Sequence, residues 1–203
     1  MQTITRRAAL LGAVSTLSGC AAISSINSAA APLDTFDLHP VAGSTSGGRR
    51  SRTLLVARPQ ASAALATDRI MIKPGAASVT YLPDARWVDE LPAVLQSLLI
   101  RSISGTGRIA YVGRSDAGPI PDKALLVRID AFEVNALDGG TFDVTVDLDL
   151  TLINDSNQRV VASRRFTKTT LVASDDVAEI VGAFQSVLND LLPEMADWAV
   201  ART

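Results

Sequence analysis

The fold of this chain is decided by one stretch of strictly alternating residues, Phe142-Asp143-Val144-Thr145-Val146-Asp147-Leu148-Asp149-Leu150-Thr151-Leu152. Successive side chains of a β-strand point to opposite faces of the sheet, so this order creates one wholly apolar face and one face of aspartate and threonine. An antiparallel strand that covers a core on one side and meets water on the other has this pattern. The stretch therefore predicts a long, half-buried strand.

Two further strands flank this one. Residues 124–134 precede it across Leu137-Asp138-Gly139-Gly140, a turn sequence typical of a hairpin. The turn at 154–157 leads on to a third strand at 159–170. Together the three strands predict an antiparallel meander.

The register of the second hairpin follows from its turn and from side-chain pairing. We expect Asp147 to lie opposite Arg165 and Val146 opposite Phe166, so that opposite charges pair outside and apolar groups pair inside.

Helical periodicity appears in two places. Between Trp87 and Ile103 apolar residues recur every three or four positions, and the sequence at 105–107 ends this helix with two glycines. A second apolar stripe runs from Val177 to Trp198 after a candidate N-cap at Ser174. Pro193 should kink or break this helix near 189–192.

Shorter extended segments complete the pattern, at 53–56, 69–72, 78–82 and 108–112. The predicted fold class is α+β, an antiparallel β-meander sheet with two amphipathic helices packed on one face.

The amino-terminal residues have the order of a lipoprotein signal. Arg6 and Arg7 precede an apolar run at 8–17, and Leu17-Ser18-Gly19-Cys20 reads as a lipobox that contains the only cysteine of the chain. The apolar run is too short for a spanning helix, which needs about 20 residues. We predict a signal peptide at 1–19, a lipidated tether at 20–34 and one domain at 35–203, with acyl chains such as palmitate on Cys20. The two arginines fit either the general secretory or the twin-arginine export route.

Residue types that carry enzyme chemistry are sparse. His39 is the only histidine, which argues against a hydrolase triad, and with Cys20 committed to lipid it leaves no set of ligands for a transition metal. The aspartates 143, 147 and 149 share a strand face, but at a two-residue period they are typical of a solvated face. The formal net charge of −2 gives no basic footprint for nucleic acid. We predict no catalytic residues, no cofactor and no metal.

Several separated stretches carry a family resemblance. They are Thr35-Phe36-Asp37-Leu38-His39-Pro40, Asp68-Arg69-Ile70, Tyr81-Leu82-Pro83-Asp84-Ala85-Arg86-Trp87 and Ile129-Asp130-Ala131-Phe132-Glu133, followed by a final helix that ends near Trp198. In this order they resemble the auxiliary lipoproteins of bacterial ABC-type transport systems, the family that includes the lipoprotein of the paraquat-inducible intermembrane transport system. The chain has Phe36 where the family usually has tyrosine, and its loop at 43–52 is longer.

The resemblance implies a lipid-anchored periplasmic accessory component of an MCE/ABC-type intermembrane transport system for phospholipid or another hydrophobic molecule. Its partners would be an MCE-domain protein with the associated permease and ATPase, and self-association into a homo-oligomer stays open. Ala21 replaces the aspartate that commonly retains lipoproteins at the inner membrane, which favours the outer membrane. The alternative function is a structural lipoprotein of envelope assembly, such as a lipopolysaccharide-export or secretion subunit.

Arg86 and Trp87, at the predicted entry of the first helix, are the candidate partner-binding residues. The alternative for Trp87 is a structural role, in which its indole covers the start of the helix and the core.

Overall fold

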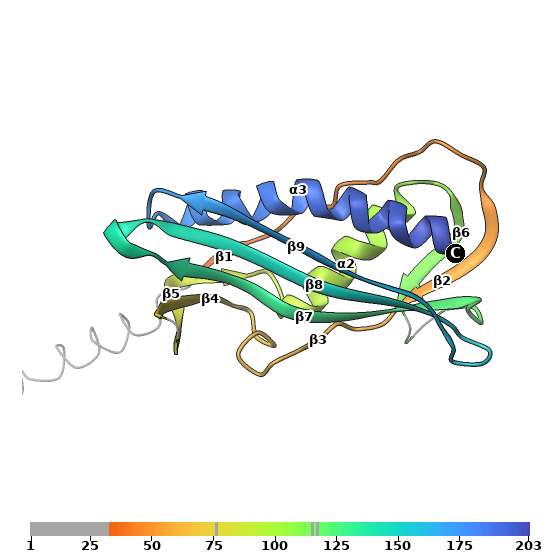
Figure 1. Ribbon diagram of the computed structural model, residues 1–203, viewed down its shortest axis with the longest axis horizontal. Helices are drawn as coiled ribbons and strands as arrows, with labels where there is room; N and C mark the ends of the chain where they lie inside the picture. Colours follow the sequence, from red (N-terminus) through yellow and green to blue (C-terminus); the bar gives the residue numbers. More distant parts are fainter. Residues whose placement is uncertain (1–32, 76, 115, 117) are drawn as a thin grey trace, which may run out of the picture. The chain divides into compact units, whose positions relative to one another are not determined.

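A computed structural model describes residues 33–75, 77–114, 116 and 118–203 (Figure 1). The folded unit spans Asp34–Thr203. The predicted signal peptide, Cys20 and most of the predicted tether lie outside the described residues.

The described residues of the folded unit form nine strands and two long helices, labelled as in Figure 1. In chain order these are β1 (Asp34–Phe36), β2 (Arg50–Val56), β3 (Gln60–Ala61), β4 (Arg69–Gly75), β5 (Ser78–Trp87), α2 (Leu91–Ser104), β6 (Ile109–Arg114), β7 (Lys123–Ala136), β8 (Phe142–Asn154), β9 (Val160–Val172) and α3 (Val177–Arg202). A short 3-10 turn at Asp138–Gly140 joins β7 to β8, with Gly139 at a φ of 80° that favours glycine.

The three long strands form the expected meander. β8 pairs antiparallel with β7 from Phe142 to Asn154 and with β9 on its other edge. The inward residues Val144, Val146, Leu148, Leu150 and Leu152 are fully buried. The outward residues from Asp143 to Thr151 are polar, and most of them bond to side chains of β7 or β9. The alternation of the central strand thus identified this part of the fold correctly.

The register of the second hairpin differs from the prediction by two residues. Asp147 lies opposite Thr167, and Arg165 lies opposite Asp149. The turn closes between Asn154 and Arg159, and an irregularity after Leu152 leaves one extra residue in β9. A shift of two residues keeps every side chain on its expected face, since strand side chains alternate with a period of two.

The predicted α+β class with two helices is confirmed, but the rest of the sheet is mixed, so the predicted antiparallel meander describes only β7, β8 and β9 and not the whole sheet. The second edge of β7 is shared by β2, β3 and β4, which pair with it in succession and in parallel. β6 extends the sheet parallel to β2, β5 lies antiparallel to β4, and β1 lies parallel to β5. Parallel neighbours need long crossover connections, which local periodicity does not reveal. One signal was present, because Leu54-Leu55-Val56 is a continuous apolar run typical of a parallel strand and is buried throughout.

The helices differ from their predicted bounds for local reasons. α2 begins at Leu91, because Trp87 is still the last residue of β5. Gly105 is the C-cap, and its N–H donates to Arg101 O at 2.9 Å. The N-cap of α3 is Asp176, whose Oδ1 accepts the N–H of Glu179 at 3.1 Å.

Two residues predicted for α3 act differently from the expectation. Ser174 lies two residues before the N-cap Asp176, and its Oγ accepts the N–H of Asp176. Pro193 does not break the helix, which continues from Val177 to Arg202. Buried Leu191, Leu192 and Met195 on either side hold this segment against the sheet, offsetting the lost backbone hydrogen bond.

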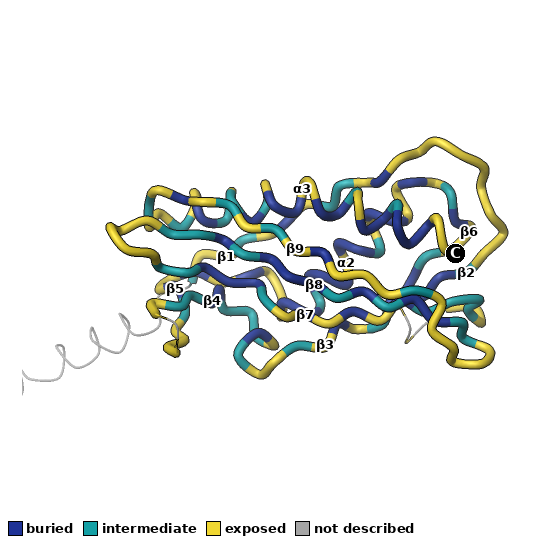
Figure 2. Tube along the Cα trace, in the orientation of Figure 1, coloured by how far each residue is buried: buried dark blue, intermediate teal, exposed yellow. Residues whose placement is uncertain are grey.

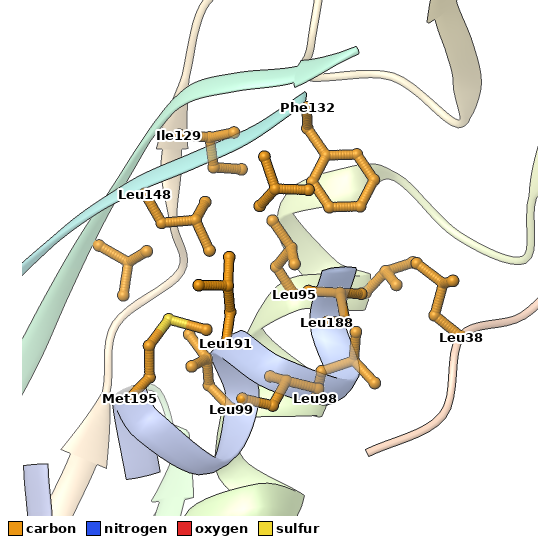
Figure 3. Packing of buried hydrophobic residues seen from close by; sticks show 14 of the residues in the cluster. Leu38, Leu95, Leu98, Leu99, Ile129, Phe132, Leu148, Leu188, Leu191 and Met195 are labelled. Atoms are coloured by element: carbon orange, nitrogen blue, oxygen red, sulfur yellow. The ribbon is translucent and has the colours of Figure 1, made fainter. Parts of the chain in front are cut away.

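Both helices pack on the apolar face of the sheet. Figure 3 shows Leu95, Leu98 and Leu99 of α2 and Leu188, Leu191 and Met195 of α3 converging on Ile129 and Leu148 of the strands. Figure 2 shows buried residues along the middle of β8 and exposed residues at the turns. Among the described residues, neither helix is long and apolar enough to cross a membrane.

Candidate partner-binding site at the corner of β5 and α2

The predicted binding residues lie at the end of β5, where three strands meet. Arg86 is opposite Thr35 of β1 on one side and Arg69 of β4 on the other. Neighbouring residues of a strand point to opposite faces. Arg86 therefore points outward and Trp87 inward.

Trp87 is a core residue, with only 1% of its surface exposed. Its ring makes edge-to-face contacts with Phe132 at 5.8 Å and with Phe184 at 5.4 Å, and those two phenyl rings stack at 4.6 Å. The indole thus joins β5, β7 and α3 and presents no surface for direct contact with a partner. Its position is that of the structural alternative.

Arg86 remains available at the surface, with 45% of its side chain exposed. Its Nε donates to Thr35 Oγ1 at 3.2 Å, and its Nη1 lies 3.8 Å from Asp68 Oδ2. These two contacts orient the guanidinium but use only part of its five N–H donors. Arg86 is thus a positioned cation with spare hydrogen-bonding capacity.

A groove runs from this corner along α2. Buried Leu38, Val94 and Leu98 contribute to its lining, and Asp37, Val88, Asp89, Ala93, Ser97 and Arg101 complete it, around a volume of about 250 Å³. Val88 follows Trp87 directly and is 55% exposed. We call this feature the corner groove. Sequence reasoning missed Val88 and the groove, because Asp37 and Leu38 reach α2 only through the pairing of β1 with β5.

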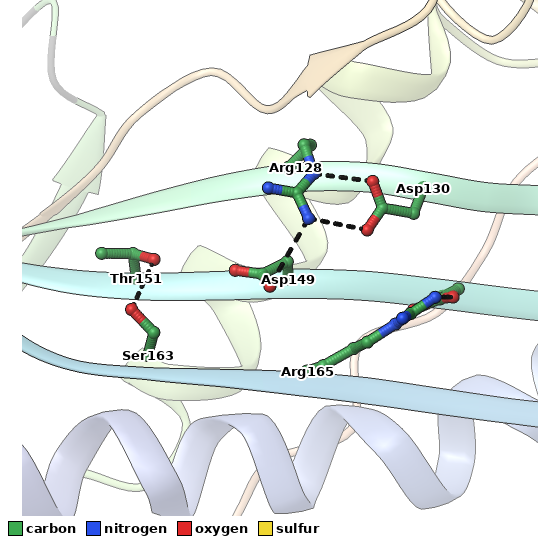
Figure 4. A network of polar contacts seen from close by, with 7 residues as sticks. Arg128, Asp130, Asp149, Thr151, Ser163 and Arg165 are labelled. Carbon is green, nitrogen blue, oxygen red and sulfur yellow. Dashed lines mark hydrogen bonds and ion pairs between the residues drawn. The ribbon is translucent and has the colours of Figure 1, made fainter.

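The three strand aspartates do not form a metal site. Asp143 Oδ1 accepts from Asn135 at 2.7 Å and from Thr145 at 3.0 Å, and Asp149 lies 3.5 Å from Arg128 (Figure 4). Asp147, expected to be solvated, is only 7% exposed, because Arg165 covers it and donates from Nε at 2.7 Å.

The titration of this outer face follows its hydrogen bonds. The hydrogen bond from Arg128 lowers the pKa of Asp130, and the hydrogen bond to Asp147 raises the pKa of Arg165. Within the described residues, no group of three or more histidine, cysteine or acidic side chains is placed to hold a metal ion.

His39 contacts Gln185 through its main chain, with its N–H donating to Oε1 at 2.8 Å.

The described residues form a small α+β domain with the corner groove at its surface. The chain belongs to the family of ABC-type transport auxiliary lipoprotein components, which matches residues 36–196. The family resemblance of its sequence motifs is thereby confirmed.

Other known proteins are similar to this chain in sequence or in fold. A DUF330 protein of Xanthomonas campestris superimposes with a TM-score of 0.75 at 27% identity, covering 83% of this chain and 96% of the other. An uncharacterised protein of Bradyrhizobium diazoefficiens is 31% identical over 152 residues, which are 74% of this chain but only 40% of that relative's length. PelC of Paraburkholderia phytofirmans, crystallised as a dodecamer, has a TM-score of 0.46 at 17% identity over 76% of this chain and 92% of its own. At that distance it bears on neither fold nor assembly here.

Proposed function

We propose that this chain is the lipid-anchored periplasmic accessory component of an MCE/ABC-type intermembrane transport system for phospholipid or another hydrophobic molecule. Its part is to bind an MCE-domain protein through the corner groove, while the permease and ATPase act elsewhere in the system. The observation that carries this proposal is the pairing of exposed Val88 and oriented Arg86 beside a groove with buried apolar residues in its lining.

The physical case rests on the rigidity and mixed chemistry of the corner. Trp87 locks the end of β5 into the core, so Arg86 and Val88 on either side of it are held in place. A rigid anchor loses little entropy on binding, and a few central residues usually supply most of an interface's energy. Asp37, Asp89 and Arg101 place charges of both signs around the groove, which favours one orientation of a partner.

Anchoring completes the proposal. Acyl chains on Cys20, followed by the predicted tether at 20–34, would hold the domain at a membrane, and Ala21 favours the outer one. The domain would then meet the end of an MCE conduit that approaches from the inner membrane.

Site-specific photo-crosslinking in the native envelope tests the docking surface. We expect a crosslinker at Val88 to capture an MCE-domain protein. The matched control is a crosslinker at Val160, which is 64% exposed on β9. Capture from Val160 but not from Val88 would contradict the assignment, as would capture of an export or secretion subunit, which the envelope-assembly alternative expects.

Charge and shape variants test the same surface quantitatively. Val88→Glu and Arg86→Glu should each reduce co-purification of the partner by about 10-fold or more, consistent with loss of a central interface residue. Val160→Glu and Arg114→Glu are the matched controls, since Arg114 is also half exposed and ion-paired. Unchanged thermal unfolding of all four variants would separate binding from folding. Equal loss in variants and controls would refute the proposal.

A further inference from the structure

Cations without an acidic partner gather at one end of the sheet. Most lysines and arginines of the described residues lie within ion-pair distance of a carboxylate. The exceptions are Arg49, Arg50, Arg69, Arg101, Lys123, Arg159 and Arg202. All of these except Arg69 and Arg101 belong to the end of the fold where β2 and β7 begin, β8 turns into β9 and α3 finishes (Figure 1). The corner groove is a separate site, which shares no lining residue with the recess at this end.

A polar recess of about 400 Å³ lies at this end. Its basic lining consists of Arg50, Arg52, Lys123 and Arg202, and Asn154 and Ser156 contribute neutral polar groups. The parallel pairing of β2 with β7 brings Arg50, Arg52 and Lys123 together, although they are far apart in the sequence. The antiparallel pairing of β7 with β8 adds Asn154 opposite Lys123. We call this feature the basic recess.

Three of its cations are held in place by neutral acceptors. Arg50 Nη1 donates to Val200 O at 3.1 Å, and Arg202 Nη1 donates to Trp198 O at 3.2 Å, so both use carbonyls near the end of α3. Lys123 Nζ donates to Asn154 Oδ1 at 2.9 Å. Each contact orients the group without neutralising it and leaves N–H donors unused.

The negative charges of the basic recess are fewer than its positive charges. Asp122 is paired with Arg52 at 2.9 Å and also accepts the N–H of Thr53 at 2.8 Å. Both hydrogen bonds lower the pKa of Asp122, and the bond from Thr53 has the larger effect. Asp122 therefore stays ionised beside Arg52. Of the described residues that line the recess, Asp122 alone has an acidic side chain, so the charges of Arg50, Lys123 and Arg202 are not matched by an acid.

We propose that the basic recess binds a phosphate group, free or as the ester of a lipid headgroup. Two arginine forks can each donate two parallel N–H bonds to phosphate oxygens, and the lysine adds a compact point charge. A tetrahedral anion with several oxygens suits cations that converge from two strands and a helix end. This inference does not depend on the corner groove or on the identity of its partner.

The test mixes the detergent-solubilised full-length lipoprotein with soluble phosphate probes. Phosphorus NMR measures the binding of each probe, and thermal unfolding measures its effect on stability. The probes are inorganic phosphate, glycerophosphoglycerol and glycerophosphocholine, with chloride at matched ionic strength as the control. We expect saturable binding of at least one phosphate probe and an increase in unfolding temperature that chloride does not reproduce. Tighter binding of inorganic phosphate would identify free phosphate as the ligand of the basic recess. Tighter binding of glycerophosphoglycerol would identify an anionic lipid headgroup as the ligand. Absence of saturable binding for all three probes would overturn the proposal.

Variants connect such binding to the basic recess. Lys123→Gln combined with Arg202→Gln should weaken binding by about 10-fold or more, since two charge-assisted donors are lost. Arg114→Gln combined with Arg128→Gln removes the same charge elsewhere and should leave affinity unchanged. Lys123→Arg is the second variant, because it keeps the charge and should retain binding even if Lys123→Gln disturbs the fold. Equal affinity of the recess variant and its matched control would refute the site.

Discussion

The two faces of β7, β8 and β9 are built from neighbouring residues of the same strands, yet they are stabilised in different ways. Inward, Val144, Val146 and Leu148 are fully buried beneath both helices. Outward, between these residues, Thr145 donates to Asp143, and Asp147 is covered by Arg165. The inner face depends on apolar area, which is non-directional, whereas the outer face depends on hydrogen-bond geometry. Changes on the inner face should therefore affect stability much more strongly than changes on the outer face.

The difference also explains where binding surfaces lie. The outer face satisfies its charges internally and offers few unused groups. Arg86 and Val88 at the corner, and Arg50 and Lys123 at the basic recess, lie where strands begin or end, and there side chains have fewer neighbours to satisfy them. The strands thus act as a scaffold, and the strand ends carry the candidate sites.

The largest effect should come from the aromatic cluster of the inner face. Phe184 lies between Trp87 and Phe132 and is fully buried. Phe184→Ala should lower the free energy of unfolding by about 3–5 kcal/mol, because it removes apolar contacts and leaves a cavity. Urea denaturation measures this change. Leu171→Ala, at a position 75% exposed on β9, is the control and should change stability by less than about 0.5 kcal/mol; equal losses would contradict the comparison.

The next effect should be an asymmetry within the outer-face ion pair. Asp147 is nearly buried, while 61% of the Arg165 side chain is exposed. Arg165→Ala leaves an uncompensated buried carboxylate, whereas Asp147→Ala leaves an arginine that water can solvate. We expect Arg165→Ala to lower the unfolding temperature more than Asp147→Ala does. The reverse order would show that Asp147 is better hydrated than its burial indicates.

These contrasts show what sequence could establish about the fold. Alternation from Phe142 to Leu152 identified the meander and its two faces, because the residue types along a strand show which of its faces is buried. The parallel pairing of β2, β3 and β4 with β7 was not predictable, since it depends on long crossovers. The register error at Asp147 arose from the closure of the turn between Asn154 and Arg159 together with one extra residue in β9, and alternation detects neither.

The candidate sites were less accessible to sequence reasoning than the fold. Arg86 and Trp87 were named together, but strand alternation at the end of β5 places them on opposite faces, with only Arg86 at the surface. The role predicted for Arg86 stays a proposal. The basic recess joins Arg50, Lys123 and Arg202 only after parallel pairing and the end of α3 bring them together.

A smaller effect should appear as pH dependence of the outer face. The hydrogen bond from Arg128 lowers the pKa of Asp130 in the folded state relative to its usual value of 3.8. Asp130 therefore contributes stability above the unfolded-state pKa, and this contribution is lost as the pH falls through the folded-state pKa. Asp130→Asn should flatten the decline in unfolding temperature between about pH 5 and about pH 2. An unchanged slope would assign the acid sensitivity to other carboxylates.

The smallest effect should come from the hydroxyl pair Thr151 and Ser163, whose oxygens lie 2.8 Å apart across β8 and β9 on the outer face (Figure 4). Cross-strand pairs of this kind contribute a few tenths of a kcal/mol, because water competes for both hydroxyls. Thr151→Ala and Ser163→Ala should each lower the free energy of unfolding by about 0.5 kcal/mol or less. A double-mutant cycle in urea isolates the coupling between them. Coupling comparable to the Phe184→Ala loss would mean that the outer face contributes to stability as strongly as the core, and would end the distinction drawn between the two faces.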